Sequence, residues 1–213
     1  MTLDELLPIA ESMGLTKEIF YDRIQKKYSE LFDSMLNKNF DDATVYEINY
    51  ITRLQDLSNI KPSETVVQAT YSKLLESGWI ETFKSLQNIT MIQPYNDIMQ
   101  NIYSKHIWNI GKEDIAGLKA LQEFTGVKIS KDIILEAYSH YIKSENVSRI
   151  SLLQSLTGVV PPENTIQEGY NRYFSEGEIL LAKDLQEMTG IAPSKEAYKQ
   201  FLKYLNRRGK KNE

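Results

Sequence analysis

Four glutamines share one position of a repeating pattern, three residues before a tyrosine, and their side chains could hydrogen-bond to a ligand. They are Gln25, Gln68, Gln100 and Gln167. An amide both donates and accepts hydrogen bonds, so a row of amides could contact a polar partner or satisfy the chain's own backbone. The equivalent position in one repeat holds Leu135 and lacks the amide. We take Gln68, Gln100 and Gln167 as candidate partner-contacting residues.

A short basic cluster near the end of the chain could meet an acidic partner or phosphates. It comprises Arg207, Arg208, Lys210 and Lys211. The chain has 25 Lys and Arg against 29 Asp and Glu, a formal net charge of −4. Apart from the segment 206–213, the body has 21 basic and 28 acidic side chains and a net charge of −7. Because phosphate contacts supply much of the affinity for nucleic acid, an acidic body favours a protein partner over RNA.

No catalytic or metal-binding pattern accompanies these residues. The 213-residue chain has no Cys, which excludes disulfides, thiolate metal sites and cysteine catalysis and predicts a cytoplasmic location. His106 and His140 each stand alone, without a second ligand at metal-binding spacing. Phosphate-binding glycine loops are absent, and no apolar run approaches the roughly 18–20 residues of a membrane span. We therefore predict a protein that is not an enzyme, uses no cofactor or metal, and does not cross a membrane.

The elements that would position these side chains follow a repeat. A Leu-Gln pair recurs at spacings of 32, 35, 32 and 32 residues, and a turn and an apolar residue follow each pair. The pairs begin at Leu54, Leu86, Leu121, Leu153 and Leu185. Two positions after the apolar residue stand Pro62, Pro94, Ile129, Pro161 and Pro193. Such a period is typical of stacked helical hairpins, and no alternating strand pattern occurs, so we predict an all-α fold.

Each repeat is predicted to form two helices. In the clearest one, Ser63 caps the start of the first helix, which Gly78 ends. Its apolar stripe is Val67, Tyr71, Leu74 and Leu75. Residues Gly111, Asn146 and Gly177 are expected to end the equivalent helices in a left-handed conformation. The second helix begins at Trp79, and its later counterparts stop at Gly126, Gly158 and Gly190.

Two other repeated side chains allow two interpretations each. Tyrosines follow the proline position by nine residues, and they are Tyr71, Tyr103, Tyr138 and Tyr170. We favour a core role with a hydrogen-bonded hydroxyl over a stacking platform for bases. The glutamine of each Leu-Gln pair either satisfies groups at the hairpin junction, which we favour, or contacts a ligand.

The ends of the chain differ from the middle. Residues 1–50 are expected to form an atypical cap unit with an insertion around 36–45, and residues 51–193 form the repeats. Residues 194–205 supply a first helix with no partner, and residues 206–213 form a basic flexible tail. We predict one helical-repeat domain over 1–205, whose terminal units present a polar outer face to water.

The stretch Gly177-Glu178-Ile179-Leu180-Leu181-Ala182, followed by Met188, Gly190, Ile191 and Pro193, resembles the pentatricopeptide and tetratricopeptide helical-hairpin repeats. The resemblance covers roughly 51–205, in divergent units of 32–35 residues, and looks more like the pentatricopeptide pattern. It implies a right-handed α-solenoid of about five antiparallel hairpins with irregular caps. It also implies base-reading positions near Gln68, Gln100, Leu135 and Gln167.

The function that follows is a non-catalytic binding or scaffold module. A concave surface of first helices would be presented to a protein or peptide partner. The alternative is single-stranded RNA binding, with the first-helix glutamines meeting bases and the basic tail meeting phosphates. The ligand, the biological process and the oligomeric state stay open.

Overall fold

The structure is a computed structural model that describes residues 8–9, 11–37 and 43–209. Within this part the chain forms eleven helices and no strand, which confirms the predicted all-α class. The helices are α2 (Lys17–Asn37), α3 (Ala43–Ser58), α4 (Glu64–Glu76), α5 (Ile80–Thr90), α6 (Asn96–Ile107), α7 (Lys112–Thr125), α8 (Lys131–Lys143), α9 (Ser148–Thr157), α10 (Glu163–Glu176), α11 (Ile179–Thr189) and α12 (Lys195–Gly209). Helices that follow each other pack in pairs, as a helical repeat requires.

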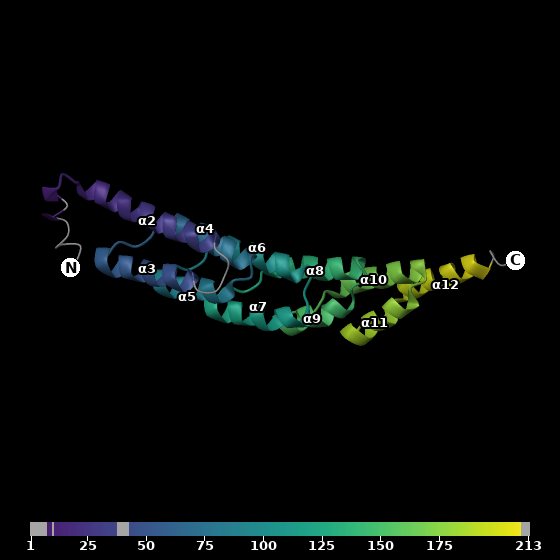
Figure 1. Cartoon of the computed structure of the whole chain (residues 1–213). Coiled ribbons are helices and arrows are strands. Elements are labelled where there is room, and N and C mark those ends of the chain that lie inside the picture. Colours follow the sequence, from purple (N-terminus) through teal and green to yellow (C-terminus); the bar gives the residue numbers. More distant parts are fainter. Residues whose placement is uncertain (1–7, 10, 38–42, 210–213) are drawn as a thin grey trace. The chain divides into compact units, whose positions relative to one another are not determined.

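The chain divides into two compact units, Met1–Ile102 and Tyr103–Glu213, with the boundary inside α6. In the first unit α2 packs on α3 and α4, and α5 packs on α3 and α4. In the second unit α10 packs on α8, α11 and α12, while α9 packs on α7, α8 and α11. Within each unit the first helices of the hairpins form one layer and the second helices form another (Figure 1). The single domain expected over 1–205 stays a prediction.

The core of each unit lies between these two layers. In the first helix α4, the side chains of Val67, Tyr71 and Leu74 are fully buried, and in the second helix α5 so are Phe83 and Leu86. This stripe is the one that the helical periodicity predicted. A hairpin alone would leave much of it in water, so neighbouring hairpins within a unit stabilise each other.

Ser63 and Gly111 do not have the roles at helix ends that the sequence predicted. Ser63 is the N-cap of α4, but its side chain makes no capping hydrogen bond. Gly111 does not end a helix in the left-handed region: its φ is −107°, and it is the N-cap of α7, where its N–H donates to the Asp114 carboxylate over 2.7 Å. The longer turn between α6 and α7 changes the role of this glycine.

The left-handed turn residues are confirmed at most other positions. Gly78 has φ +77° and Gly177 has φ +84°, as expected after first helices. After α8, however, the positive φ of +62° belongs to Glu145 and not to Asn146. The second helices end at left-handed residues in all five hairpins: Asn59, Met91, Gly126, Gly158 and Gly190.

The two ends of the described chain are irregular. The first hairpin is long, with 21 residues in α2 and 16 in α3, and part of its predicted insertion lies outside the described residues. At the other end α12 continues past Leu205 to Gly209, so Arg207 and Arg208 belong to a helix. No helix of the described part is both long enough and apolar enough to cross a membrane.

Candidate binding surface

The repeat tyrosines hold the loops that join one hairpin to the next. Each hydroxyl donates to the backbone carbonyl of the apolar residue just after the turn. The pairs are Tyr28 with Ile60, Tyr71 with Ile92, Tyr103 with Val127, Tyr138 with Val159, and Tyr170 with Ile191, at 2.5–2.9 Å. All five rings are fully buried. The predicted core role with a hydrogen-bonded hydroxyl is confirmed.

A threonine or serine closes the same turn at the end of each second helix. In α5 the Thr90 hydroxyl donates to the carbonyl of Leu86 over 2.9 Å and accepts the N–H of Ile92 over 3.4 Å. The equivalents Ser58, Thr125, Thr157 and Thr189 make the same two bonds. The residue after the hydroxyl is left-handed, and its N–H bonds the carbonyl of the pair glutamine. This arrangement satisfies carbonyls that a helix end otherwise leaves open.

The first-helix glutamine Gln68 binds the backbone of the following loop through both ends of its amide. Its nitrogen donates to the carbonyl of Gln93 over 2.6 Å, and its oxygen accepts the N–H of Tyr95 over 2.9 Å. We call this two-bond contact the amide clamp. Gln68 is 3% exposed, so it offers little surface to a partner.

The same amide clamp occurs twice more. Gln25 donates to the carbonyl of Lys61 and accepts the N–H of Ser63, both over 2.8 Å. Gln167 donates to Ala192 over 2.9 Å and accepts from Ser194 over 2.8 Å, and it is half-buried. Gln100, also half-buried, donates to Asn96 over 3.3 Å. Contact between these glutamines and a partner stays a prediction.

The repeat that lacks the glutamine also lacks one of the two backbone groups that the glutamine would bind, the N–H. In each clamp the amide oxygen accepts an N–H from the residue after the proline position, namely Ser63, Tyr95 or Ser194. In the repeat with Leu135 that residue is Pro162, which has no N–H. The adjacent Pro161-Pro162 pair is the sequence signal that could have revealed the structural role of the row.

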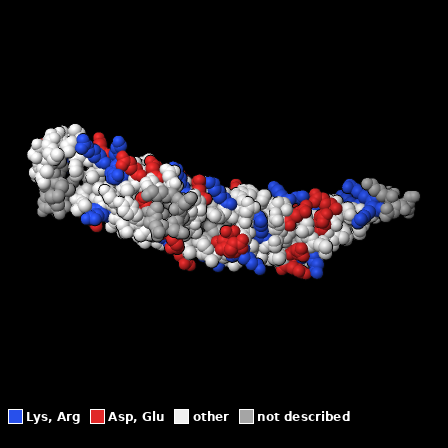
Figure 2. Space-filling model, in the orientation of Figure 1, with Lys and Arg blue, Asp and Glu red and all other residues white. Residues whose placement is uncertain are grey.

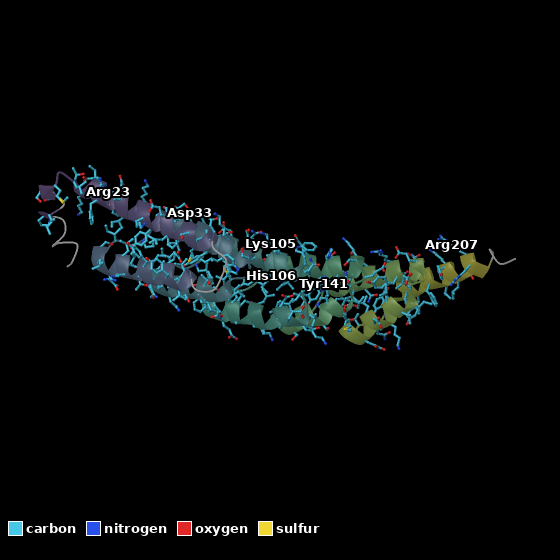
Figure 3. All side chains as sticks on the ribbon, viewed as in Figure 1. Arg23, Asp33, Lys105, His106, Tyr141 and Arg207 are labelled. Atoms are coloured by element: carbon cyan, nitrogen blue, oxygen red, sulfur yellow. The ribbon has the colours of Figure 1, made fainter. Side chains whose placement is uncertain are left out.

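In the second unit a further set of side chains links one first helix to the previous one. The Tyr173 hydroxyl of α10 donates to the Ile142 carbonyl of α8 over 2.6 Å. Tyr141 of α8 donates in the same way to the Ile107 carbonyl, and it lies between the two layers (Figure 3). Arg172 of α10 donates to the Lys143 carbonyl and pairs with Glu176 over 3.1 Å. Backbone carbonyls at the C-terminal ends of α6 and α8 therefore accept hydrogen bonds from side chains of the same unit.

Grooves lie between adjacent first helices at equivalent repeat positions in both units. Between α2 and α4 a groove of about 250 Å³ is lined by Ser29, Phe32, Asp33, Leu36, Val66, Ala69, Thr70 and Lys73. Between α8 and α10 a smaller one of about 90 Å³ is lined by Ser139, Ile142, Lys143, Thr165, Glu168, Gly169 and Arg172. Measured from the repeat tyrosines, each residue of the smaller set corresponds to one of the larger set. The agreement shows that the repeat itself builds this surface feature.

The groove of the first unit is the more open of the two. It continues into a second hollow of about 210 Å³, which shares Leu36 and Lys73 and ends at Trp79. Asp33 lies on α2, on the side away from α3 (Figure 3). Asp33 and Lys73 have no ion-pair partner among the described residues, whereas the equivalent Arg172 is already bonded within its own unit. Sequence analysis missed these groove residues, although their spacing from the repeat tyrosines could have identified them.

The basic cluster is only partly described. Arg207 and Arg208 lie in the last turn of α12, and Arg208 stands 5.9 Å over the Tyr204 ring. Figure 3 marks Arg207 near the end of that helix. Lys210 and Lys211 lie outside the described residues. Gln68 and Gln100 belong to the first unit, and these arginines belong to the second.

The remaining candidate side chains have local partners. The His140 ring packs against the edge of Trp108, with the ring centres 4.4 Å apart, and His106 is half-buried. Within the described part no group of three or more His, Cys, Asp or Glu side chains could hold a metal ion. Of the pair glutamines, Gln122 accepts the N–H of Ile129 over 3.4 Å, and Gln87 donates to Gln93 over 2.7 Å.

Neither protein-family models nor curated proteins give a match to this chain.

Proposed function

We propose that this protein is a non-catalytic binding module that presents its first-helix layer to a protein or peptide partner. The observation that supports this proposal is the groove between neighbouring first helices, which recurs at equivalent positions in both units. We propose further that the hairpins form a right-handed α-solenoid of pentatricopeptide or tetratricopeptide type, with a cytoplasmic location.

The groove of the first unit gives the partner its chemistry. Its walls combine apolar surface from Leu36, Val66 and Ala69 with an acidic group, Asp33, and a basic group, Lys73. A peptide with an apolar side chain between a basic and an acidic one complements this set. Such charges set orientation and specificity more than raw affinity.

Single-stranded RNA remains the alternative, and two observations favour protein over it. Three of the first-helix glutamines are bonded to this chain's own loops. In addition, basic and acidic side chains are mixed over the face seen in Figure 2, whereas phosphate binding favours a basic face.

A random peptide library displayed on phage, selected on the full chain, tests the proposal. Selected peptides should bind the wild type saturably and lose about tenfold in affinity with Lys73→Glu. The control Lys119→Glu makes the same charge change at an exposed position of the second-helix layer and should leave affinity unchanged. Equal losses from both variants would mean that overall charge, and not the groove, governs binding.

A random single-stranded RNA pool is the second arm of the experiment. RNA affinity that exceeds peptide affinity, falls steeply with salt and weakens with Arg207→Ala and Arg208→Ala would replace the peptide proposal by the RNA one. Failure of both probes would overturn the assignment of the first-helix layer as a binding surface.

A further inference from the structure

The helix α12 exposes side chains whose counterparts in α4, α8 and α10 are buried. Counted from Pro193, α12 is a first helix in the register of α4 counted from Pro62. Its Tyr198, Leu202 and Leu205 correspond to Val67, Tyr71 and Leu74 of α4. The α4 side chains are 0% exposed, whereas those of α12 are 50%, 59% and 44% exposed. This end of the second unit therefore lacks the polar outer face that was expected of a terminal repeat.

The exposure is confined to one side of a well-anchored helix. Phe174 of α10 packs on Tyr198 and Phe201 of α12, with ring centres 5.7 and 5.3 Å apart. The Tyr204 ring lies against Gly177, where a β-carbon would collide with it, and Ala197 is fully buried. Because α12 is held by these contacts, its exposed stripe has a fixed direction.

The complete hairpins indicate what would cover such a stripe. In α4 the equivalent stripe is covered by the second helix α5, which buries Phe83 and Leu86. The second helices α7, α9 and α11 bury a similar pair three residues apart: Leu118 and Leu121, Ile150 and Leu153, Ala182 and Leu185. Helices of 11 residues suffice, as α5 and α11 show. The described part of the chain holds no such helix opposite α12.

The charge of α12 indicates the composition of a covering helix. Five basic side chains stand on α12 against the single acid Glu196. On the helix, Lys195 and Lys199 border the exposed stripe, with Lys199 paired to Glu196 over 2.7 Å. On the neighbouring α11, Lys183 and Glu187 pair over 3.3 Å and balance each other. Figure 2 shows the blue side chains gathered at this end of the second unit.

We propose that α12 binds an acidic amphipathic α-helix of a partner protein, which takes the position of a second helix. The partner helix would carry two apolar side chains three residues apart, the second of them Leu, with Asp or Glu on the flank that faces Lys195 and Lys199. Burial of the Tyr198, Leu202 and Leu205 stripe supplies affinity, and the opposite charges select the partner.

The probe for this site can be copied from the chain's own second helix. A fluorescein-labelled peptide of residues 178–189 with Lys183→Glu carries the pair Ala182 and Leu185 and four acidic side chains. Added to the full chain, it should give a saturable rise in fluorescence anisotropy. Leu202→Lys should weaken binding about tenfold or more, because it places a charge in the centre of the stripe.

Matched controls separate this site from others. Leu57→Lys alters an exposed leucine of α3, 43% accessible, and should not change peptide affinity. If it weakens binding as much as Leu202→Lys does, the peptide binds α3 and the proposal is wrong. A peptide with all four acids replaced by Lys should bind more weakly, and equal binding would overturn the acidic assignment.

A tethered form of the peptide and assays of self-association and vesicle binding test the proposal further. Because a short peptide is a poor helix in water, the same sequence should also be appended to the chain through a Gly-Ser linker. The extension should raise the melting temperature, and Leu202→Lys should abolish the rise; no rise would refute the site. Self-association by sedimentation, or binding to anionic vesicles, that depends on Leu202 and outcompetes the peptide would assign the stripe to a second copy or to a membrane instead.

Discussion

The loop after α5 and the loop after α9 join equivalent helices, but their side-chain contacts differ. Both receive a tyrosine hydroxyl, from Tyr71 and Tyr138 respectively. Only the loop after α5 also receives an amide clamp, from Gln68. The loop after α9 has Leu135 opposite it and two consecutive prolines.

The difference shows what the recurring glutamine is for. An amide oxygen buried beside a loop stabilises it when a backbone N–H is there to donate, and Pro162 removes that donor. Proline also fixes its own φ, which limits the loop without any side-chain contact. A row of glutamines that is interrupted where the backbone donor is missing is explained by loop support, which needs no ligand.

Alkaline pH should break the tyrosine hydrogen bond that each of the two loops accepts. This is the largest effect on stability that we expect. Burial raises the pKa of Tyr71 and Tyr138 to about 12, and that of Tyr28, Tyr141, Tyr170 and Tyr173 likewise. In the unfolded chain a tyrosine has a pKa of about 10. The unfolded state therefore loses its proton first, so the stability is full below about pH 10 and falls as the pH rises through about 12.

Urea unfolding followed by circular dichroism at a series of pH values measures this fall. The double variant Tyr71→Phe, Tyr138→Phe should be less stable at neutral pH and show a shallower loss between pH 10 and 12, since two of the titrating groups are gone. Tyr46→Phe changes a ring that is 61% exposed and should leave the slope unaltered. Equal slopes in all three proteins would show that burial of Tyr71 and Tyr138 does not cause the loss.

Removal of the amide clamp should separate the two loops. Gln68→Leu deletes two hydrogen bonds, and it leaves the Gln93 carbonyl without its donor and the Tyr95 N–H without its acceptor. We expect a loss of about 2 kcal/mol in the free energy of unfolding, because each of the two bonds contributes about 1 kcal/mol. Hydrogen exchange at Tyr95 should accelerate, while exchange at Val159 should not change.

A surface glutamine provides the comparison for that variant. Gln186→Leu makes the same change at an exposed position of α11, where the effect should stay within about 0.5 kcal/mol. If Gln68→Leu costs no more than Gln186→Leu, the clamp contributes nothing to stability, and Gln68 becomes available again as a partner-binding residue.

The sequence was enough to predict the helices and the core role of the repeat tyrosines. It was not enough to predict the role of the first-helix glutamines. Hairpin boundaries follow from local signals, such as the apolar stripe of α4 and the left-handed Gly126 and Gly190. The partners of Gln68 lie 25 and 27 residues away, so its role depends on the path of a loop that no local pattern specifies. The grooves depend on the spacing of two packed helices. The stripe of α12 is exposed because the described part of the chain has no second helix opposite it.

The smallest expected effect comes from adding the clamp to the loop that lacks it. Leu135→Gln alone would leave the amide oxygen without its donor, because Pro162 has no N–H, and it should cost up to about 1 kcal/mol by placing an amide where a leucine was half-buried. Pro162→Ser alone frees the loop and should also be slightly destabilising. Together the two substitutions restore the donor and the acceptor found at Ser194 and Gln167. The double variant should therefore be more stable than the sum of the single changes, by about 1 kcal/mol of coupling in urea unfolding. Strict additivity would mean that the two substituted positions do not form the clamp, and that the glutamine row is interrupted at Leu135 for a reason other than the missing N–H.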